Sequence, residues 1–167
     1  MIAAMADSRT SKPVTLVLED EAATVRFGRK LAGLLRRGDV VALSGGLGSG
    51  KTALARAVVR AFLAEEEVPS PTFTLVQTYD TPDFAIWHVD LYRLDGPSEI
   101  RELGLDDAID AGGVLLIEWP ERAGAWPPGD RLDISLSFGK SAAARRAELT
   151  ARGDWCDRLP ALVEKGI

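Results

Sequence analysis

The sequence has little of what marks secreted, metal-holding or membrane proteins. Cys156 is its only cysteine and His88 its only histidine, so it can form neither an internal disulfide nor a Cys/His metal cluster. No apolar run approaches the roughly eighteen residues of a membrane-spanning helix, and residues 1–12 lack the basic segment and apolar core of a secretory signal. These absences predict a cytoplasmic protein with no disulfide and no membrane segment.

Positive charge is also in the minority. Lysine and arginine total 20 against 25 aspartate and glutamate residues, for a net charge of −5. This balance argues against a broad, non-specific nucleic-acid surface, which would need a basic excess. What the chain does have is a globular composition, with 167 residues of which 46% are hydrophobic and 27% charged. We expect a single domain over residues 13–167, preceded by a loose tail over residues 1–12.

The most informative stretch follows a short apolar run at Val40–Leu43, which is typical of a buried strand. Gly45-x-x-x-x-Gly50-Lys51-Thr52 fully matches the phosphate-binding loop (P-loop) pattern. Glycines let backbone N–H groups approach an anion, the helix start adds further N–H donors, and the lysine supplies a charge for the β- and γ-phosphates. The threonine hydroxyl suits Mg²⁺. The expected nucleotide-binding residues of this loop are Gly45, Gly46, Leu47, Gly48, Ser49, Gly50, Lys51, Thr52 and Ala53.

The remaining pattern predicts helices alternating with strands. Helices are expected at Glu21–Arg37 with Asp20 as N-cap, from the P-loop to near Ala64, at Ser98–Ile109 with a break around Gly104, and weakly at Trp155–Lys165, where Pro160 limits the helix. Strands are expected at Val14–Leu18, Val40–Leu43, Leu75–Tyr79, Phe84–Val89, Val114–Ile117, Arg131–Phe138 and Ala147–Ala151, and Pro120–Asp130 as a loop. The fold class is therefore α/β, a P-loop NTPase-like mixed and mostly parallel sheet covered by helices.

Two acidic residues end apolar strands, where a P-loop protein needs a metal partner and a group to position water. Glu118 follows Val114–Ile117, and Asp90 follows Phe84–Val89. Spacing does not separate their roles: either could hold Mg²⁺ or orient the nucleophile, and either could instead pair with an arginine such as Arg93. His88 shares a strand face with Asp90 and is open to a structural or a catalytic role.

Beyond the P-loop, three blocks resemble one family. They are SPTFTLV at Ser70–Val76, HVDLYRL at His88–Leu94 and IEWPER at Ile117–Arg122. With LSGGLGSGKT they are similar, in order and spacing, to the TsaE (YjeE) family of bacterial P-loop ATPases, which serve the threonylcarbamoyladenosine (t6A) modification of tRNA. The resemblance runs from about Leu18 to the Arg131–Phe138 strand.

The resemblance implies roles that composition and spacing do not. Thr52 and Glu118 would be Mg²⁺ ligands, and Asp90, which could also reach the metal, would join Lys51 and Glu118 as a catalytic residue. Glu21 to Thr24 would lie near the adenine, and Ser70–Thr74 would sense the γ-phosphate. Arg145 or Arg146 would add a nucleotide contact from the C-terminal part. The partner would be the TsaD–TsaB complex, with tRNA reached indirectly, which suits the acidic charge balance.

The predicted activity is Mg²⁺-dependent ATP hydrolysis that is weak in the isolated chain, because the sequence offers no obvious arginine finger. One alternative is a small-molecule kinase of P-loop type, although Pro120–Asp130 contains only Arg122 and makes a poor arginine-rich lid. A second alternative is a non-hydrolytic switch, in which bound ATP orders the Ser70–Thr74 segment and docks a partner.

Overall fold

The computed structural model describes residues 9–71 and 75–164. The helices are α1 (Glu21–Ala32), α2 (Lys51–Phe62), α3 (Ser98–Glu102), α4 (Leu105–Asp110), η1 (Pro120–Ala123, a 3₁₀ turn) and α5 (Trp155–Val163). The strands are β1 (Val14–Leu18), β2 (Val40–Ser44), β3 (Val76–Asp80), β4 (Ala85–Asp90), β5 (Val114–Glu118), β6 (Arg131–Phe138) and β7 (Arg145–Arg152). In these two ranges, no helix is long and apolar enough to cross a membrane.

The strands form one mixed sheet in the order β1-β7-β6-β2-β5-β4-β3. The four central strands β6, β2, β5 and β4 run parallel, whereas β1, β7 and β3 pair antiparallel at the two sides. Parallel strands need both faces covered, and β2 and β5 are accordingly apolar and buried along nearly their whole length. The predicted α/β fold class is confirmed, with parallel pairing confined to the centre of the sheet.

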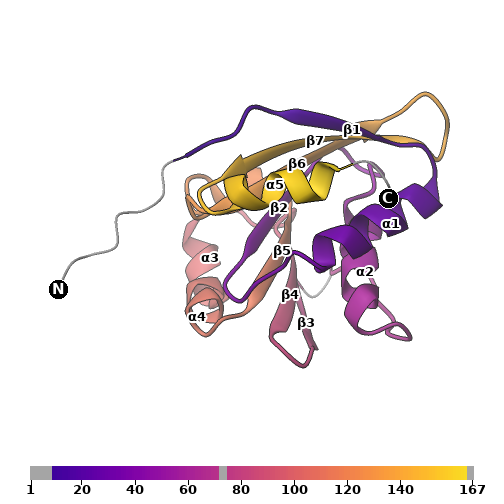
Figure 1. The fold of residues 1–167 in the computed structure, drawn as a ribbon. Coiled ribbons are helices and arrows are strands. Elements are labelled where there is room, and N and C mark those ends of the chain that lie inside the picture. Colours follow the sequence, from indigo (N-terminus) through magenta and orange to yellow (C-terminus); the bar gives the residue numbers. More distant parts are fainter. Residues whose placement is uncertain (1–8, 72–74, 165–167) are drawn as a thin grey trace.

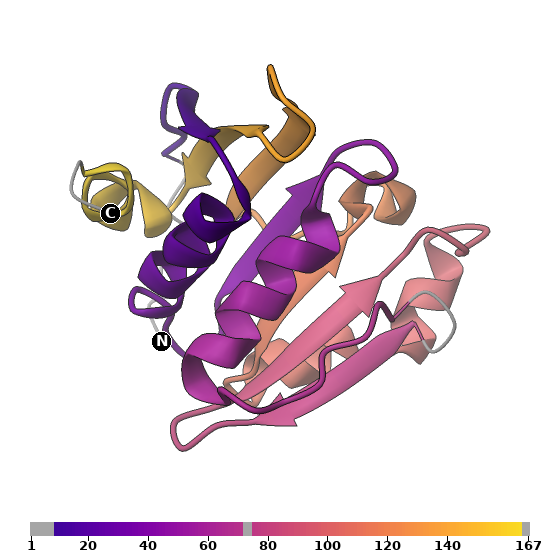
Figure 2. The same cartoon turned by 90° about the vertical axis from the view of Figure 1, so that its right-hand side faces the viewer.

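Helices cover both faces (Figure 1), with α3 and α4 on one and α1 and α2 on the other. Figure 2 shows α1 and α2 lying side by side in front of the sheet. Their close approach depends on Gly28, because a Cβ there would come within 2.5 Å of the Ala57 Cβ. The P-loop connects the carboxyl end of β2 to the start of α2.

Helix α1 is shorter than predicted and ends at Ala32, not Arg37. The backbone N–H of Arg36 donates to Asp39 Oδ2 at 2.6 Å, and the Leu34 carbonyl accepts from Arg158 Nη1 at 2.8 Å. These side chains compete with the helical hydrogen-bond ladder, so the chain turns before β2. The prediction of a helix up to Arg37 is therefore wrong at its C-terminal end.

Two further expectations change at the ends of the described chain. Residues 9–11 are not a loose tail: Ser11 N donates to Ala151 O at 2.8 Å, and Arg9 forms an ion pair with Asp157 at 2.8 Å. Residues 1–8 lie outside the described residues. Pro160 sits inside α5 and does not end it, because Leu159 and Leu162 on either side of it are buried in the core.

Candidate functional site

The loop between β2 and α2 has the backbone that its glycines predict. Gly45, Gly48 and Gly50 have φ of +140°, +74° and +106°. A Cβ on Gly45 would collide with the Leu136 carbonyl and lie 2.5 Å from Ser49 Oγ, so the turn requires glycine. No side chain caps the start of α2. A helix N-terminus of this kind, approached through a glycine-rich turn, is suited to bind an anion.

Lys51 is buried and lies over the loop. Its Nζ donates to the carbonyls of Gly45 at 2.6 Å and Gly46 at 2.9 Å, and it lies 4.2 Å from the centroid of the Trp119 ring. Burial lowers the pKa of the Lys51 ammonium group, and the nearby carboxylates, Glu118 first, act in the opposite direction. A phosphate at the loop would favour the charged form further.

The two strand-end acids meet beside this lysine. Asp90 and Glu118 are aligned partners on the parallel strands β4 and β5, and only 4% and 3% of their surfaces are exposed. The Thr52 hydroxyl donates to both oxygens of Glu118, at 2.9 and 3.0 Å. Asp90 Oδ1 accepts from the backbone N–H of Tyr92 at 2.9 Å. The structure therefore brings Thr52, Glu118 and Asp90 to one place at the end of the P-loop.

These side chains fit a magnesium ion bound together with a nucleotide. Mg²⁺ prefers oxygen ligands and usually takes one or two carboxylates, completing its shell with phosphate oxygens and water. Thr52 and Glu118 supply a hydroxyl and a carboxylate within 3.0 Å of each other. Among the described residues no group of three or more His, Cys, Asp or Glu could hold a metal by itself. The ion would thus depend on the nucleotide for its remaining ligands.

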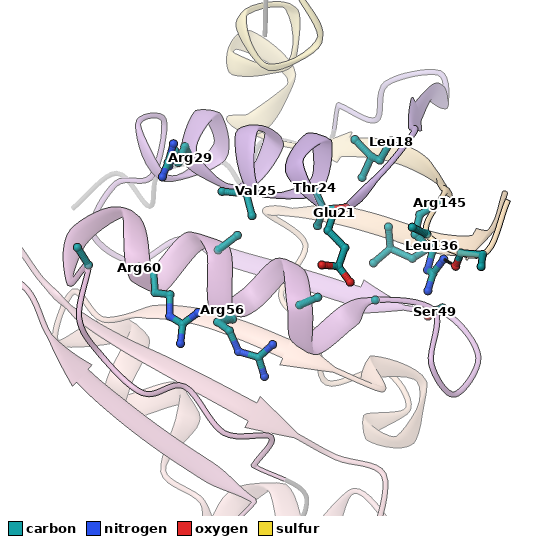
Figure 3. Close-up of a pocket in the computed structure, with 16 residues that line it drawn as sticks. Leu18, Glu21, Thr24, Val25, Arg29, Ser49, Arg56, Arg60, Leu136 and Arg145 are labelled. Carbon is teal, nitrogen blue, oxygen red and sulfur yellow. Dashed lines mark hydrogen bonds between the residues drawn. The ribbon is translucent and has the colours of Figure 1, made fainter.

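A cavity of about 690 Å³ lies next to the loop and extends along the groove between α1 and α2 (Figure 3). Glu21 extends from α1 toward α2, and Arg145 lies beside Ser49. Among the residues expected to bind nucleotide, Glu21, Thr24, Ser49, Gly50 and Ala53 line this cavity. They come from elements far apart in sequence, which the fold places around one space.

The C-terminal arginines have different environments. Arg145 is half-buried, lines the cavity and donates from Nη2 to Gly48 O at 3.2 Å, whereas Arg146 is exposed. The sequence left open which of these two arginines contacts the nucleotide. Of the two, Arg145 is the one that contacts the P-loop. Leu47 is 71% exposed at the tip of the loop. In the segment expected to sense the γ-phosphate, Ser70 is exposed, and Thr72 to Thr74 lie outside the described residues.

Sequence reasoning missed two contacts in this site. His88, left open between roles, is fully buried with Nε2 2.6 Å from Glu118 Oε2. The Trp119 ring covers the ammonium group of Lys51. A signal for the first existed in the alternation of β4, which places His88 on the same face as Asp90. The alignment of β4 with β5 was not visible in the sequence, and the positive φ of Trp119, +59°, was not either.

A glycine-rich loop between a central parallel strand and a helix, with strand-end carboxylates beside it, defines a P-loop NTPase-like α/β protein. Residues 18–147 match the family model described as threonylcarbamoyl adenosine biosynthesis protein TsaE. The chain belongs to the TsaE family, as its sequence motifs indicated.

The chain is also similar to individual proteins over most of their length. The chain is 42% identical to the tRNA threonylcarbamoyladenosine biosynthesis protein TsaE of Rickettsia bellii, over 73% of this chain and 85% of that protein. It is 35% identical to the Haemophilus influenzae protein of the same name, over 83% and 90%. The crystal structure of Bacillus subtilis YdiB superposes with a TM-score of 0.74 at 26% identity, covering 89% of this chain and 91% of that one.

Proposed function

We propose that this chain is the ATP-hydrolysing component of tRNA t6A biosynthesis, and that it acts in the cytoplasm on the TsaD–TsaB complex without transferring the threonylcarbamoyl group itself. Membership of the TsaE family supports the role in t6A biosynthesis. The observation that carries the ATPase assignment is the meeting of Thr52, Glu118 and Asp90 beside the P-loop. Burying two carboxylates at that point is unfavourable unless each has a partner, and a bound metal ion and an attacking water would supply one for each.

The residues divide the work as follows. The backbone N–H groups of the loop and the Lys51 ammonium group would bind the β- and γ-phosphates. Thr52 and Glu118 would hold Mg²⁺, which supplies charge compensation on the phosphates when bound. Asp90, buried next to Glu118, would orient the attacking water and accept its proton.

The cavity beside the P-loop offers space for the adenosine part of the nucleotide. It lies directly beyond Ser49 and Gly50, and it is lined by Glu21 and Thr24 at the start of α1. ATP with its triphosphate in the loop would extend its adenosine part into this space. Arg145, which already contacts the loop at Gly48, would lie along the bound nucleotide.

The test compares ATP binding, ATP hydrolysis and repeated tRNA modification for the wild type, Glu118→Gln and Asp90→Asn, with and without TsaD–TsaB. Glu148→Gln, an exposed strand residue on β7, is the matched control. We expect weak hydrolysis by the wild type alone and stimulation by the complex. We expect about 100-fold or greater loss in the Asp90 variant with ATP binding retained, because general-base and positioning groups contribute on that scale.

Other outcomes would select the alternatives. If both site variants bind ATP and the complex still modifies tRNA repeatedly, hydrolysis is dispensable and the chain is a nucleotide-dependent switch. If a phosphorylated metabolite accumulates instead of free phosphate, the chain is a kinase. Rapid hydrolysis by the isolated wild type, unchanged by TsaD–TsaB, would contradict a partner-dependent ATPase.

A further inference from the structure

His88 and Glu118 form a buried pair inside the site. The His88 side chain is fully buried and the Glu118 side chain is 3% exposed, and their Nε2 and Oε2 atoms are 2.6 Å apart. They lie on the neighbouring strands β4 and β5, on the face that α1 and α2 cover. Thr52 approaches the same carboxylate from α2. Glu118 is therefore held from two sides, by a hydroxyl and by an imidazole.

The direction of the hydrogen bond follows from the chemistry of the acceptor. An ionised carboxylate can only accept, so the imidazole donates its Nε2 proton to Glu118. The other ring nitrogen, Nδ1, is buried, and no described residue forms a hydrogen bond with it. A buried nitrogen without a partner is unfavourable, because it has given up its hydrogen bonds to water and gained none in return. Core packing alone would be served better by an apolar side chain, so the pattern points to a role for the Nε2 contact itself.

We infer that His88 is a positioning residue for Glu118. Its Nε2–H fixes the carboxylate in the orientation that faces Thr52, and this preorganises the hydroxyl–carboxylate pair for a cation that arrives with the nucleotide. Hydrogen bonds to ligating carboxylates commonly tune metal affinity in this way. The inference rests on the proposed function only in assuming that Mg²⁺ binds with the nucleotide at Thr52 and Glu118.

Two variants separate positioning from packing. In His88→Gln the side-chain amide N–H can replace the Nε2 donor, whereas His88→Leu fills a similar volume with no donor. The probe is a fluorescent ADP analogue, titrated with excess Mg²⁺ and again with EDTA. This readout needs no hydrolysis, and the ratio of the two dissociation constants reports the contribution of the metal.

We expect the wild type to bind the analogue more tightly with Mg²⁺ than with EDTA. His88→Leu should lose about 10- to 100-fold of that enhancement, the range found when hydrogen bonds to metal ligands are removed, with affinity in EDTA unchanged. His88→Gln should keep most of it. Urea unfolding of each variant shows that the protein is folded at the temperature used.

Opposite results would overturn the inference. If His88→Leu keeps the wild-type enhancement, or if affinity falls equally with Mg²⁺ and with EDTA, His88 only supports the structure. If His88→Gln loses as much as His88→Leu, the N–H donor is not what matters. If the wild type binds the ADP analogue equally tightly with Mg²⁺ and with EDTA, both the proposed metal site and this inference are overturned. If the wild type shows the Mg²⁺ enhancement and His88→Leu loses it, but the wild type hydrolyses no ATP with or without TsaD–TsaB, the inference stands and only the proposed ATPase activity fails.

Discussion

The Lys51 ammonium nitrogen lies 4.2 Å from the centroid of the Trp119 ring. Trp119 follows Glu118 directly and has the left-handed backbone conformation, which is uncommon for a bulky side chain. Its ring also contacts that of Tyr92, with centroids 4.9 Å apart. The P-loop lysine is thus covered by an aromatic group from the same turn that supplies the Glu118 carboxylate, and Tyr92 links this turn to the segment after β4.

Replacing Trp119 tests this contact. Phenylalanine keeps an aromatic face for the ammonium group, whereas leucine removes it at nearly the same apolar volume. A cation–π contact is worth about 0.5–2 kcal/mol when partly desolvated. We therefore expect Trp119→Leu to lower the free energy of unfolding by about 1 kcal/mol more than Trp119→Phe, measured by urea denaturation without nucleotide. Equal losses would mean that Lys51 gains nothing from the ring.

The neighbouring arginines of β7 form a natural pair of test and control. Arg145 lines the cavity and contacts Gly48, whereas Arg146 is exposed. We expect Arg145→Met to weaken ATP binding by about tenfold, corresponding to one charge-assisted hydrogen bond, and Arg146→Met to leave it unchanged. Isothermal titration calorimetry measures both. An Arg146 variant that binds more weakly than the Arg145 variant would show that the nucleotide takes another path.

A buried ion pair connects helix α5 to the residue that precedes β2. Arg158 contacts both oxygens of Asp39, at 2.6 and 2.9 Å, and the two side chains are 5% and 9% exposed. Arg158→Met leaves the Asp39 charge buried without its partner, so we expect a loss of about 3–5 kcal/mol in the free energy of unfolding. Arg36→Met breaks only an exposed contact to Asp154 and should cost less than about 1 kcal/mol. Similar losses in denaturant unfolding would contradict this account.

Tyr79 gives the protein a sensitivity to alkaline pH. Burial raises the pKa of its phenol, Glu66 acts in the same direction, and Arg56 opposes both. Above pH 10.0, the ordinary value, the unfolded chain loses this proton before the folded chain does. The unfolded state then binds fewer protons, so the free energy of unfolding falls as pH rises. The contribution is fully present below that pH.

Tyr79→Phe should remove this part of the pH dependence. The buried hydroxyl has no hydrogen-bond partner among the described residues, so its removal at pH 8 should be neutral or stabilising by about 1 kcal/mol. Urea unfolding of both proteins from pH 8 to pH 11 measures the difference, which should grow in favour of the variant. A wild type that stays as stable as the variant at the alkaline end would contradict the raised pKa.

Much of the fold was predictable from local pattern. Alternating apolar residues located β6, turn residues separated β3 from β4, and Gly104 marked the break between α3 and α4. Local pattern failed where distant side chains intervened. Asp39 and Arg158 take backbone groups that a longer α1 would have used. Helix α5 continues through Pro160, where Leu159 and Leu162 are buried in the core.

The P-loop and the family are readable from the order of residues alone, because each residue of the loop meets a separate local requirement of phosphate binding and the family's motifs follow in a fixed order. The sequence also placed Asp90 and Glu118 at strand ends. The folded chain was needed to show that β4 and β5 are neighbours, so that His88, Asp90, Glu118 and Thr52 meet. It was also needed to show that β7 brings Arg145 to the loop. Strand order and register depend on contacts between distant residues, and local pattern does not encode which buried strand lies next to which.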